Sequence, residues 1–179
     1  PFLTRDLFAY ANVPYRIKPY AHLLADPKET VDFEPDVETL VRRRVQSTGA
    51  DGKQVWDESG QVRLVNMTEK LLVSILAKLS NFIPEAGIWM NTQRPEWNDA
   101  NNALVGNGVS VVTLCYLRRY LAFCLSILEP LRQTPIYLAV EVGRWLEEIG
   151  RDLERHRPLL AGRISDRDRK RVLDDLGRA

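Results

Sequence analysis

Apolar residues recur at helical spacing along much of the chain, and this pattern predicts a mainly helical protein. A first apolar stripe begins after Pro35, which suits the first turn of a helix, and ends at Gly49, a typical helix stop. Its members are Val37, Leu40, Val41 and Val45. Before this stripe, several prolines limit the chain to short helical pieces, which we expect around Leu3–Ala11 and His22–Leu24.

The clearest helix start lies at Asn66. Glu69 follows three residues later, which is the spacing of a capping box. An apolar stripe at helical spacing then predicts a helix as far as Ile83, with Pro84 ending it. The stripe consists of Leu71, Leu72, Ile75, Leu76, Leu79 and Ile83.

Two helices and one hairpin are predicted around these. A helix opens at Thr134 and runs through Ile149, and a highly charged helix follows a Ser165 cap over Asp166–Leu176. A short β-hairpin with a four-residue turn is predicted over residues 53–56 and 61–65. Together with the other stripes, these elements predict an all-α fold of helical layers with one small β-hairpin.

The stretch from Ser110 to Leu128 is apolar nearly all round, which predicts a helix that is buried on every side. It has the hydropathy of a membrane span, but Arg118 and Arg119 interrupt it at the centre, so we favour a buried helix of a soluble protein. Few helices are available to enclose it. We therefore expect an exposed apolar surface on this helix or on the Thr134 helix, to be covered by further sequence or by a second copy.

Composition narrows the function classes. The 179 residues carry 25 basic and 24 acidic side chains, so no basic field favours nucleic acid or a membrane as a partner. Cys115 and Cys124 fall in one helix, about 13 Å apart along its axis and on opposite faces, so they cannot pair with each other. No metal or disulfide framework is visible, which favours a reducing, cytoplasmic compartment, no metal and no cofactor.

The segment GIWMNTQRPEWNDANNALVGNG, residues 87–108, differs from the apolar stretches on both sides of it. It combines two tryptophans with five asparagines, a glutamine, an arginine and two acids. Indoles stack on the apolar faces of sugar rings, while amides, Arg and carboxylates hydrogen-bond to hydroxyl groups. This mixture fits a carbohydrate site. A structural loop with anchoring tryptophans is the alternative.

Within this segment, PEWNDANNALVG resembles the GDWNDG stretch of the cellobiose phosphorylase family and similar Trp-Asn-Asp stretches of glycogen-debranching glucosidases. These proteins are glycoside hydrolases and phosphorylases with an (α/α)6-toroid fold. The resemblance implies that Asp99 is the general acid and that Trp97 and Asn98 shape the site. The chain differs from the family motif at Glu96, where the family has Asp, and at Ala100, where it has Gly.

The resemblance implies a carbohydrate-active enzyme, a glycoside hydrolase or phosphorylase, that acts on an oligo- or polysaccharide. Residues 1–179 would then be a single helical domain or a fragment of a larger catalytic domain, resembling part of the toroid. Glu96 or Glu85 could supply the second carboxylate, which an inverting hydrolase needs at roughly 6.5–9.5 Å from the acid. The expected substrate ligands are Trp89, Asn91, Gln93, Arg94, Trp97, Asn98, Asn101 and Asn102.

A second hypothesis assigns no catalysis to the chain. In it, the protein is a helical scaffold or interaction domain, and residues 87–108 form a structural or partner-binding loop. An open cleft beside Trp89 and Trp97 would favour the enzyme, and its absence would favour the scaffold.

Overall fold

The computed structural model describes residues 1–91 and 105–179, which form six α-helices and seven short strands in three antiparallel sheets. The prediction of an all-α fold with one small hairpin is therefore wrong, because the chain is mixed α/β. The strands are only two or three residues long, and one pair joins residues more than 50 positions apart. Such strands leave no alternating pattern for the sequence to reveal.

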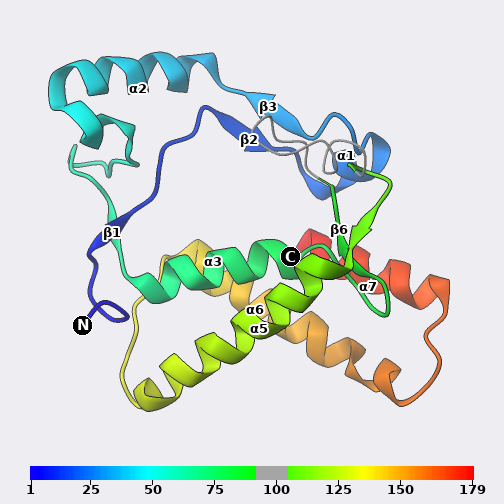
Figure 1. The fold of residues 1–179 in the computed structure, drawn as a ribbon. Helices are drawn as coiled ribbons and strands as arrows, with labels where there is room; N and C mark the ends of the chain where they lie inside the picture. The colour runs from blue at the N-terminus through cyan, green and yellow to red at the C-terminus, as the bar shows by residue number, and fades with distance from the viewer. Residues whose placement is uncertain (92–104) are drawn as a thin grey trace.

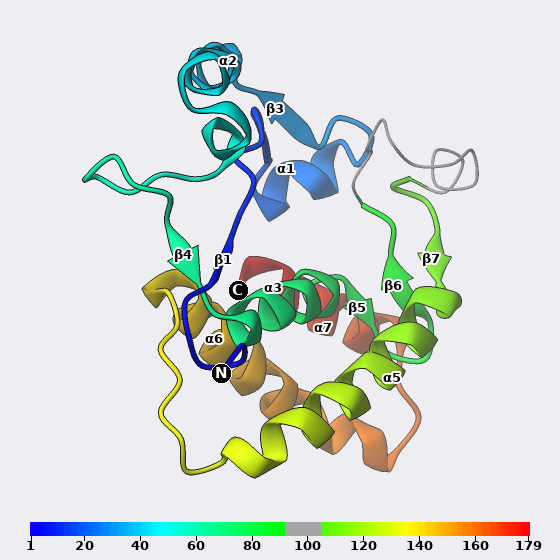
Figure 2. The same cartoon turned by 60° about the vertical axis from the view of Figure 1, so that its left-hand side comes forward.

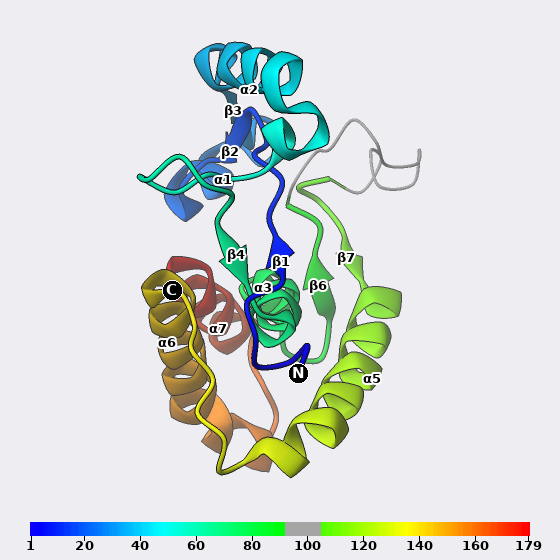
Figure 3. The same cartoon turned by 90° about the vertical axis from the view of Figure 1, so that its left-hand side faces the viewer.

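Helix α3 (Met67–Leu79) contributes to two apolar clusters, and Figure 3 shows it at the centre of the helical body. Ile75 faces one cluster, which contains Ile88 of strand β6 (Gly87–Trp89) together with Leu117 and Cys124 of helix α5 (Val111–Leu128). The adjacent Leu76 is fully buried in the other. That second cluster is completed by helices α6 (Val140–His156) and α7 (Asp166–Arg178). Two neighbouring residues of α3, Ile75 and Leu76, thus pack into the two clusters, so α3 links them.

Three predicted helix caps are confirmed. The side chains of Asn66, Ser110 and Ser165 each accept a hydrogen bond from the backbone N–H three residues later. At Ser165 the bond is reciprocal, because the Asp168 carboxylate also accepts from the Ser165 backbone N–H. The helix predicted after Pro35 is confirmed as well, as α2 (Pro35–Thr48), and it ends at Gly49 with a positive φ of 67°.

Two predicted helix boundaries are wrong. Helix α3 ends at Leu79 because the chain then extends into strand β5 (Phe82–Ile83), which pairs with the following strand β6. Helix α6 begins at Val140 and not at Thr134, because the preceding residues are bound to the start of α3. The Asn66 side-chain amide donates to the Tyr137 carbonyl at 2.6 Å, and the buried Glu69 carboxylate accepts from the Ala139 N–H at 2.7 Å.

The three sheets are small. Strand β5 pairs with β6, which pairs in turn with β7 (Val109–Ser110). Strand β2 (Tyr15–Ile17) pairs with β3 (Val31–Phe33), and β1 (Phe8–Ala9) pairs with β4 (Leu64–Val65). The helix predicted over Leu3–Ala11 is therefore absent from that range. The predicted hairpin is reduced to a tight turn closed by a single bridge between Trp56 and Val62.

The N-terminal part crosses above the helical body (Figures 1 and 2). Its helix α1 (Tyr20–Ala25) agrees with the predicted piece at His22–Leu24 and docks on α7 through Tyr20, whose hydroxyl donates to the Asp174 carboxylate at 2.7 Å. The following helix, α2, buries none of its residues and continues into a short 3-10 helix, Gly49–Lys53. Figure 1 shows this pair at the far edge of the molecule.

Helix α5 is not buried on every side, and that prediction is wrong. Only Leu117 and Cys124 are buried, because α5 meets its neighbours along a single stripe. The expected exposed apolar surface on this helix is present. Its exposed large apolar residues are Val111, Val112, Tyr116, Leu121, Phe123 and Leu125. By length and composition, residues 111–131 could also cross a membrane.

Candidate functional site

Two of the predicted site residues, Trp89 and Asn91, lie in the described part of the chain. The predicted catalytic residues Glu96 and Asp99 lie outside the described residues. So do the other predicted substrate ligands, which are Gln93, Arg94, Trp97, Asn98, Asn101 and Asn102. The geometry available for the site is therefore that of its flanks and of the surface around Trp89 and Asn91.

Trp89 and Asn91 both line a pocket of about 450 Å³. This volume falls in the range of small-molecule sites, roughly 300–1,000 Å³. The lining comes from several elements that are distant in the sequence: α1, the C-terminal end of α3, strand β6, the first turn of α5, α6 and the end of α7. The pocket therefore exists only because the N-terminal part docks over the helical body.

Among the described residues, three aromatic side chains line the pocket: Tyr20, Trp89 and Trp145. Tyr20 and Trp89 meet edge to face, with ring centroids 6.5 Å apart. The Trp89 indole N–H donates to the Gly106 carbonyl at 3.2 Å, and the Trp145 indole N–H donates to the Ser80 hydroxyl at 3.2 Å. Since both indole N–H groups already have acceptors in the protein, the rings offer a ligand apolar surface.

Polar groups lie beside these rings. The Asn91 amide donates to the Asn81 side-chain oxygen at 2.6 Å, and Asn91 is buried. Lys18 also lines the pocket and forms ion pairs with Glu29 and Asp32. The hydrogen bond that Lys18 donates to the Glu29 carboxylate raises the pKa of Lys18 above its ordinary value, so Lys18 stays a cation. No Asp or Glu side chain is present in the described lining, so this part of the wall supplies no acid for catalysis.

The backbone holds together the two chain ends that flank residues 92–104. The Met90 N–H donates to the Gly108 carbonyl at 3.0 Å, and the Gly106 N–H donates to the Met90 carbonyl at 2.6 Å. Gly106 has a φ of 78°, and a Cβ at this position would lie 2.6 Å from Pro27. Only glycine fits that conformation and that space. The described residues on the two sides of residues 92–104 are thus joined to each other, and Met90 among them lines the pocket.

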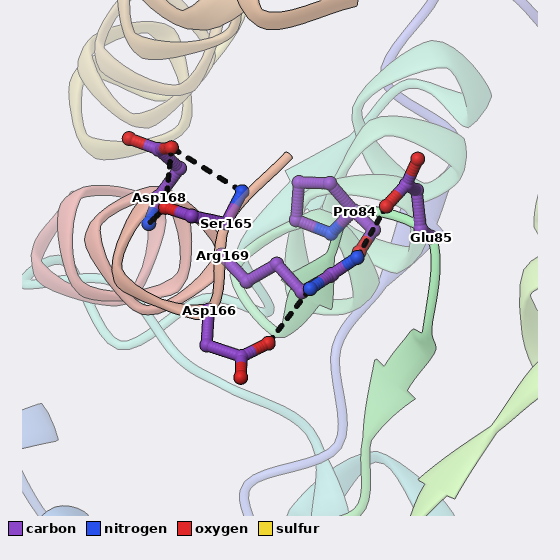
Figure 4. Close-up of polar contacts among 6 residues, drawn as sticks. All are labelled: Pro84, Glu85, Ser165, Asp166, Asp168 and Arg169. Carbon is purple, nitrogen blue, oxygen red and sulfur yellow. Dashed lines mark hydrogen bonds and ion pairs between the residues drawn. The ribbon is translucent and has the colours of Figure 1, made fainter. Parts of the chain in front are cut away.

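Glu85, an option for the second carboxylate, has a different place (Figure 4). It lies in the turn between β5 and β6 with a φ of 59°, and it pairs with Arg169 of α7. Arg169 also donates to the Pro84 carbonyl at 3.2 Å and to the Asp166 carboxylate at 2.7 Å. Glu85 is not among the pocket residues. Its contacts fasten the turn to α7.

Among the lining residues that the sequence analysis did not predict are Tyr20, Ser80, Asn81 and Trp145. Trp145 belongs to the apolar pattern of α6, and Ser80 and Asn81 follow the end of α3, where polar residues are common. Each has an ordinary local explanation. What these residues share is their proximity in the folded chain, and a single sequence does not show it.

Neither the known protein families nor the curated proteins compared with this chain contain a match.

Proposed function

We propose that this chain is a carbohydrate-active enzyme, a glycoside hydrolase or phosphorylase, or a segment of one. The observation that carries the proposal is the aromatic and amide-lined pocket beside the joined residues that flank the Trp-Asn-Asp segment. A sugar ring has apolar faces and a polar rim, and the pocket offers both kinds of surface. The pocket alone would fit other small polar ligands as well. The resemblance of the Trp-Asn-Asp motif is what favours a sugar over them.

In this proposal the described pocket residues bind the sugar, and residues of the segment 92–104 carry out the reaction. Tyr20, Trp89 and Trp145 provide apolar ring surface, and the Asn81–Asn91 pair and the Ser80 hydroxyl provide hydrogen-bonding groups. Asp99 donates its proton to the glycosidic oxygen as the bond to the anomeric carbon breaks. Because the described lining holds no carboxylate side chain, the acid, and in hydrolysis the base as well, would come from residues elsewhere, as the motif implies.

Two nucleophiles are considered for the attack on the anomeric carbon, water and inorganic phosphate. In hydrolysis, Glu96 takes a proton from a water molecule that attacks the anomeric carbon. In phosphorolysis, inorganic phosphate attacks that carbon directly, Arg94 balances its charge, and no base is needed. Adding or omitting phosphate in the assay separates the two.

Sugar binding is tested by titrating the protein with cello- and malto-oligosaccharides and recording calorimetric heats. We expect saturable binding that falls at least about tenfold in Trp89→Ala, a loss of 1.4 kcal/mol or more. Trp56→Ala is the matched control, because this indole packs under Arg44 and is not part of the pocket. Equal binding by both variants would contradict the proposal.

Catalysis is tested by product release from the same oligosaccharides, with and without phosphate. Asp99→Asn should abolish turnover while it leaves saccharide binding within about twofold, since removal of a general acid affects the transition state more than the ground state. Turnover by Asp99→Asn at the wild-type rate would remove Asp99 from the mechanism. Binding without turnover in the wild type would leave a lectin-like site.

The alternative is a non-catalytic helical scaffold or interaction domain, and the exposed apolar surface of α5 favours it. In that case residues 87–108 serve a structural or partner-binding role. Absence of any saccharide binding, together with binding of a protein partner, would support this alternative.

A further inference from the structure

Helix α5 exposes two apolar flanks on either side of its buried stripe. At 100° per residue, Val112, Tyr116 and Phe123 lie on one flank, and Val111 and Leu125 lie on the other. These five side chains are between 53% and 66% exposed. Single exposed apolar residues are common on proteins, but five on one helix are typical of a surface that binds a partner.

Each flank also carries one arginine at the middle of the helix. Arg118 lies beside Val111 and Leu125, and Arg119 lies beside Val112 and Phe123, with its guanidinium 5.9 Å from the Tyr116 ring centroid. Both arginines are exposed. Within residues 1–91 and 105–179, neither has an ion-pair partner, and α5 itself contains no acidic residue.

This charge pattern disfavours two simple occupants of the surface. Helix α5 runs from 111 to 128, so its midpoint falls next to Arg119. Two copies packed through α5 about a twofold axis would bring the arginine pairs together, whether the helices ran parallel or antiparallel, and like charges would repel. A lipid bilayer that α5 spanned would receive the same two cations at its apolar centre.

We propose that the flanks of α5 form a docking surface for an apolar helix of a partner protein that carries carboxylates near its middle. The apolar side chains provide the contact area, and the central arginines fix the register and select against neutral or basic helices. This inference does not depend on the proposed function, because none of the five flank residues or the two arginines lines the pocket.

The charge-swapped variant Arg118→Glu/Arg119→Glu provides a probe with the chemistry expected of the partner. It presents the same apolar helix with carboxylates at its centre, and both substitutions are at exposed positions. Sedimentation velocity would compare the wild type, the variant and their equimolar mixture. We expect the mixture to form a heterodimer at least about tenfold tighter than either homodimer. Raising the salt concentration should weaken it.

Three further measurements complete the test. Phe123→Asp in the wild-type partner should abolish the heterodimer, which would assign the contact to α5. A wild-type homodimer as tight as the mixture would overturn the proposal in favour of a second copy, and flotation of the wild type with phosphatidylcholine vesicles would overturn it in favour of a bilayer. A mixture that sediments as two monomers would also overturn it. If the double variant does not fold by circular dichroism, Arg119→Glu alone takes its place.

Discussion

Helices α5 and α7 have opposite compositions and opposite environments. Nine of the thirteen residues of α7 are charged, yet it buries Val172, Leu173 and Leu176. Helix α5 has two charged residues among eighteen, yet it buries only Leu117 and Cys124. Burial along a helix therefore follows the neighbours that are present and not the average polarity of its residues.

The contacts of α7 explain how so charged a helix becomes part of the core. Its apolar residues lie on one face and meet Leu76 of α3 and Ile149 of α6. Its charges are satisfied locally, as in the Ser165–Asp168 cap and the Arg169 contacts drawn in Figure 4. In the described structure helix α5 meets its neighbours, α3 and β6, along one stripe, so most of its apolar residues stay exposed even though they are more numerous.

The largest expected difference between the two helices concerns truncation of a leucine. Leu176→Ala removes a fully buried side chain of α7 and should lower the free energy of unfolding by about 2–5 kcal/mol. Leu125→Ala on α5 removes a side chain that is 65% exposed and should change it by less than about 0.5 kcal/mol. Urea denaturation measures both. Equal losses would mean that α5 is packed as tightly as α7.

A smaller difference is expected between two helical glycines. A Cβ at Gly177 of α7 would lie 2.3 Å from the Tyr20 ring, which is fixed by its hydrogen bond to Asp174. Gly177→Ala should therefore destabilise the protein by about 1–3 kcal/mol. Gly143→Ala in α6 is the control, because that Cβ would meet nothing within 4 Å, and it should stabilise the helix by roughly 0.5–1 kcal/mol. If Gly177→Ala were also stabilising, Tyr20 would not be docked against α7.

The smallest effect concerns pH. Burial alone would raise the pKa of Asp174, but hydrogen bonds from Lys170 and Tyr20 outweigh it and hold the pKa below the ordinary 3.8. A carboxylate with a lowered folded-state pKa stabilises the fold above its ordinary pKa, and this contribution is lost as the pH falls through the folded-state value. Asp174→Asn should thus be less stable than wild type at about pH 6, and the gap should close as the pH falls below the folded-state pKa of Asp174. A gap that is independent of pH would show that the carboxylate charge has no part in docking α1.

The elements that the sequence predicts well are those with local signals. The caps at Asn66, Ser110 and Ser165 each use a side chain and an amide three residues apart, so both partners are visible in a short window. The strands and the start of α6 depend on distant partners. Strand β1 forms because Val65 lies opposite Phe8, and α6 starts late because Glu69 binds the Ala139 N–H. No local pattern contains these pairs.

The same distinction applies to the candidate site. Trp89 and Asn91 were predicted because an unusual polar segment draws attention to them, and both line the pocket. Tyr20 and Trp145 line it too, but they come from α1 and α6, and nothing in either local sequence marks them. The burial of α5 was overestimated for a related reason, since an apolar sequence shows what a helix could bury and not what is present to bury it.

The central structural claim is that α5 packs along one stripe and leaves its remaining faces exposed, and its two cysteines test this directly. Cys115 is exposed and Cys124 is buried, and burial raises the pKa of the Cys124 thiol, which reduces its reactive thiolate. Thiol titration of the native protein with a chromogenic disulfide reagent should therefore give one fast thiol, assigned to Cys115 by its loss in Cys115→Ser. The second should react only on unfolding. Two protected thiols would mean that α5 is enclosed, and two fast thiols would mean that it is not packed on α3 at all.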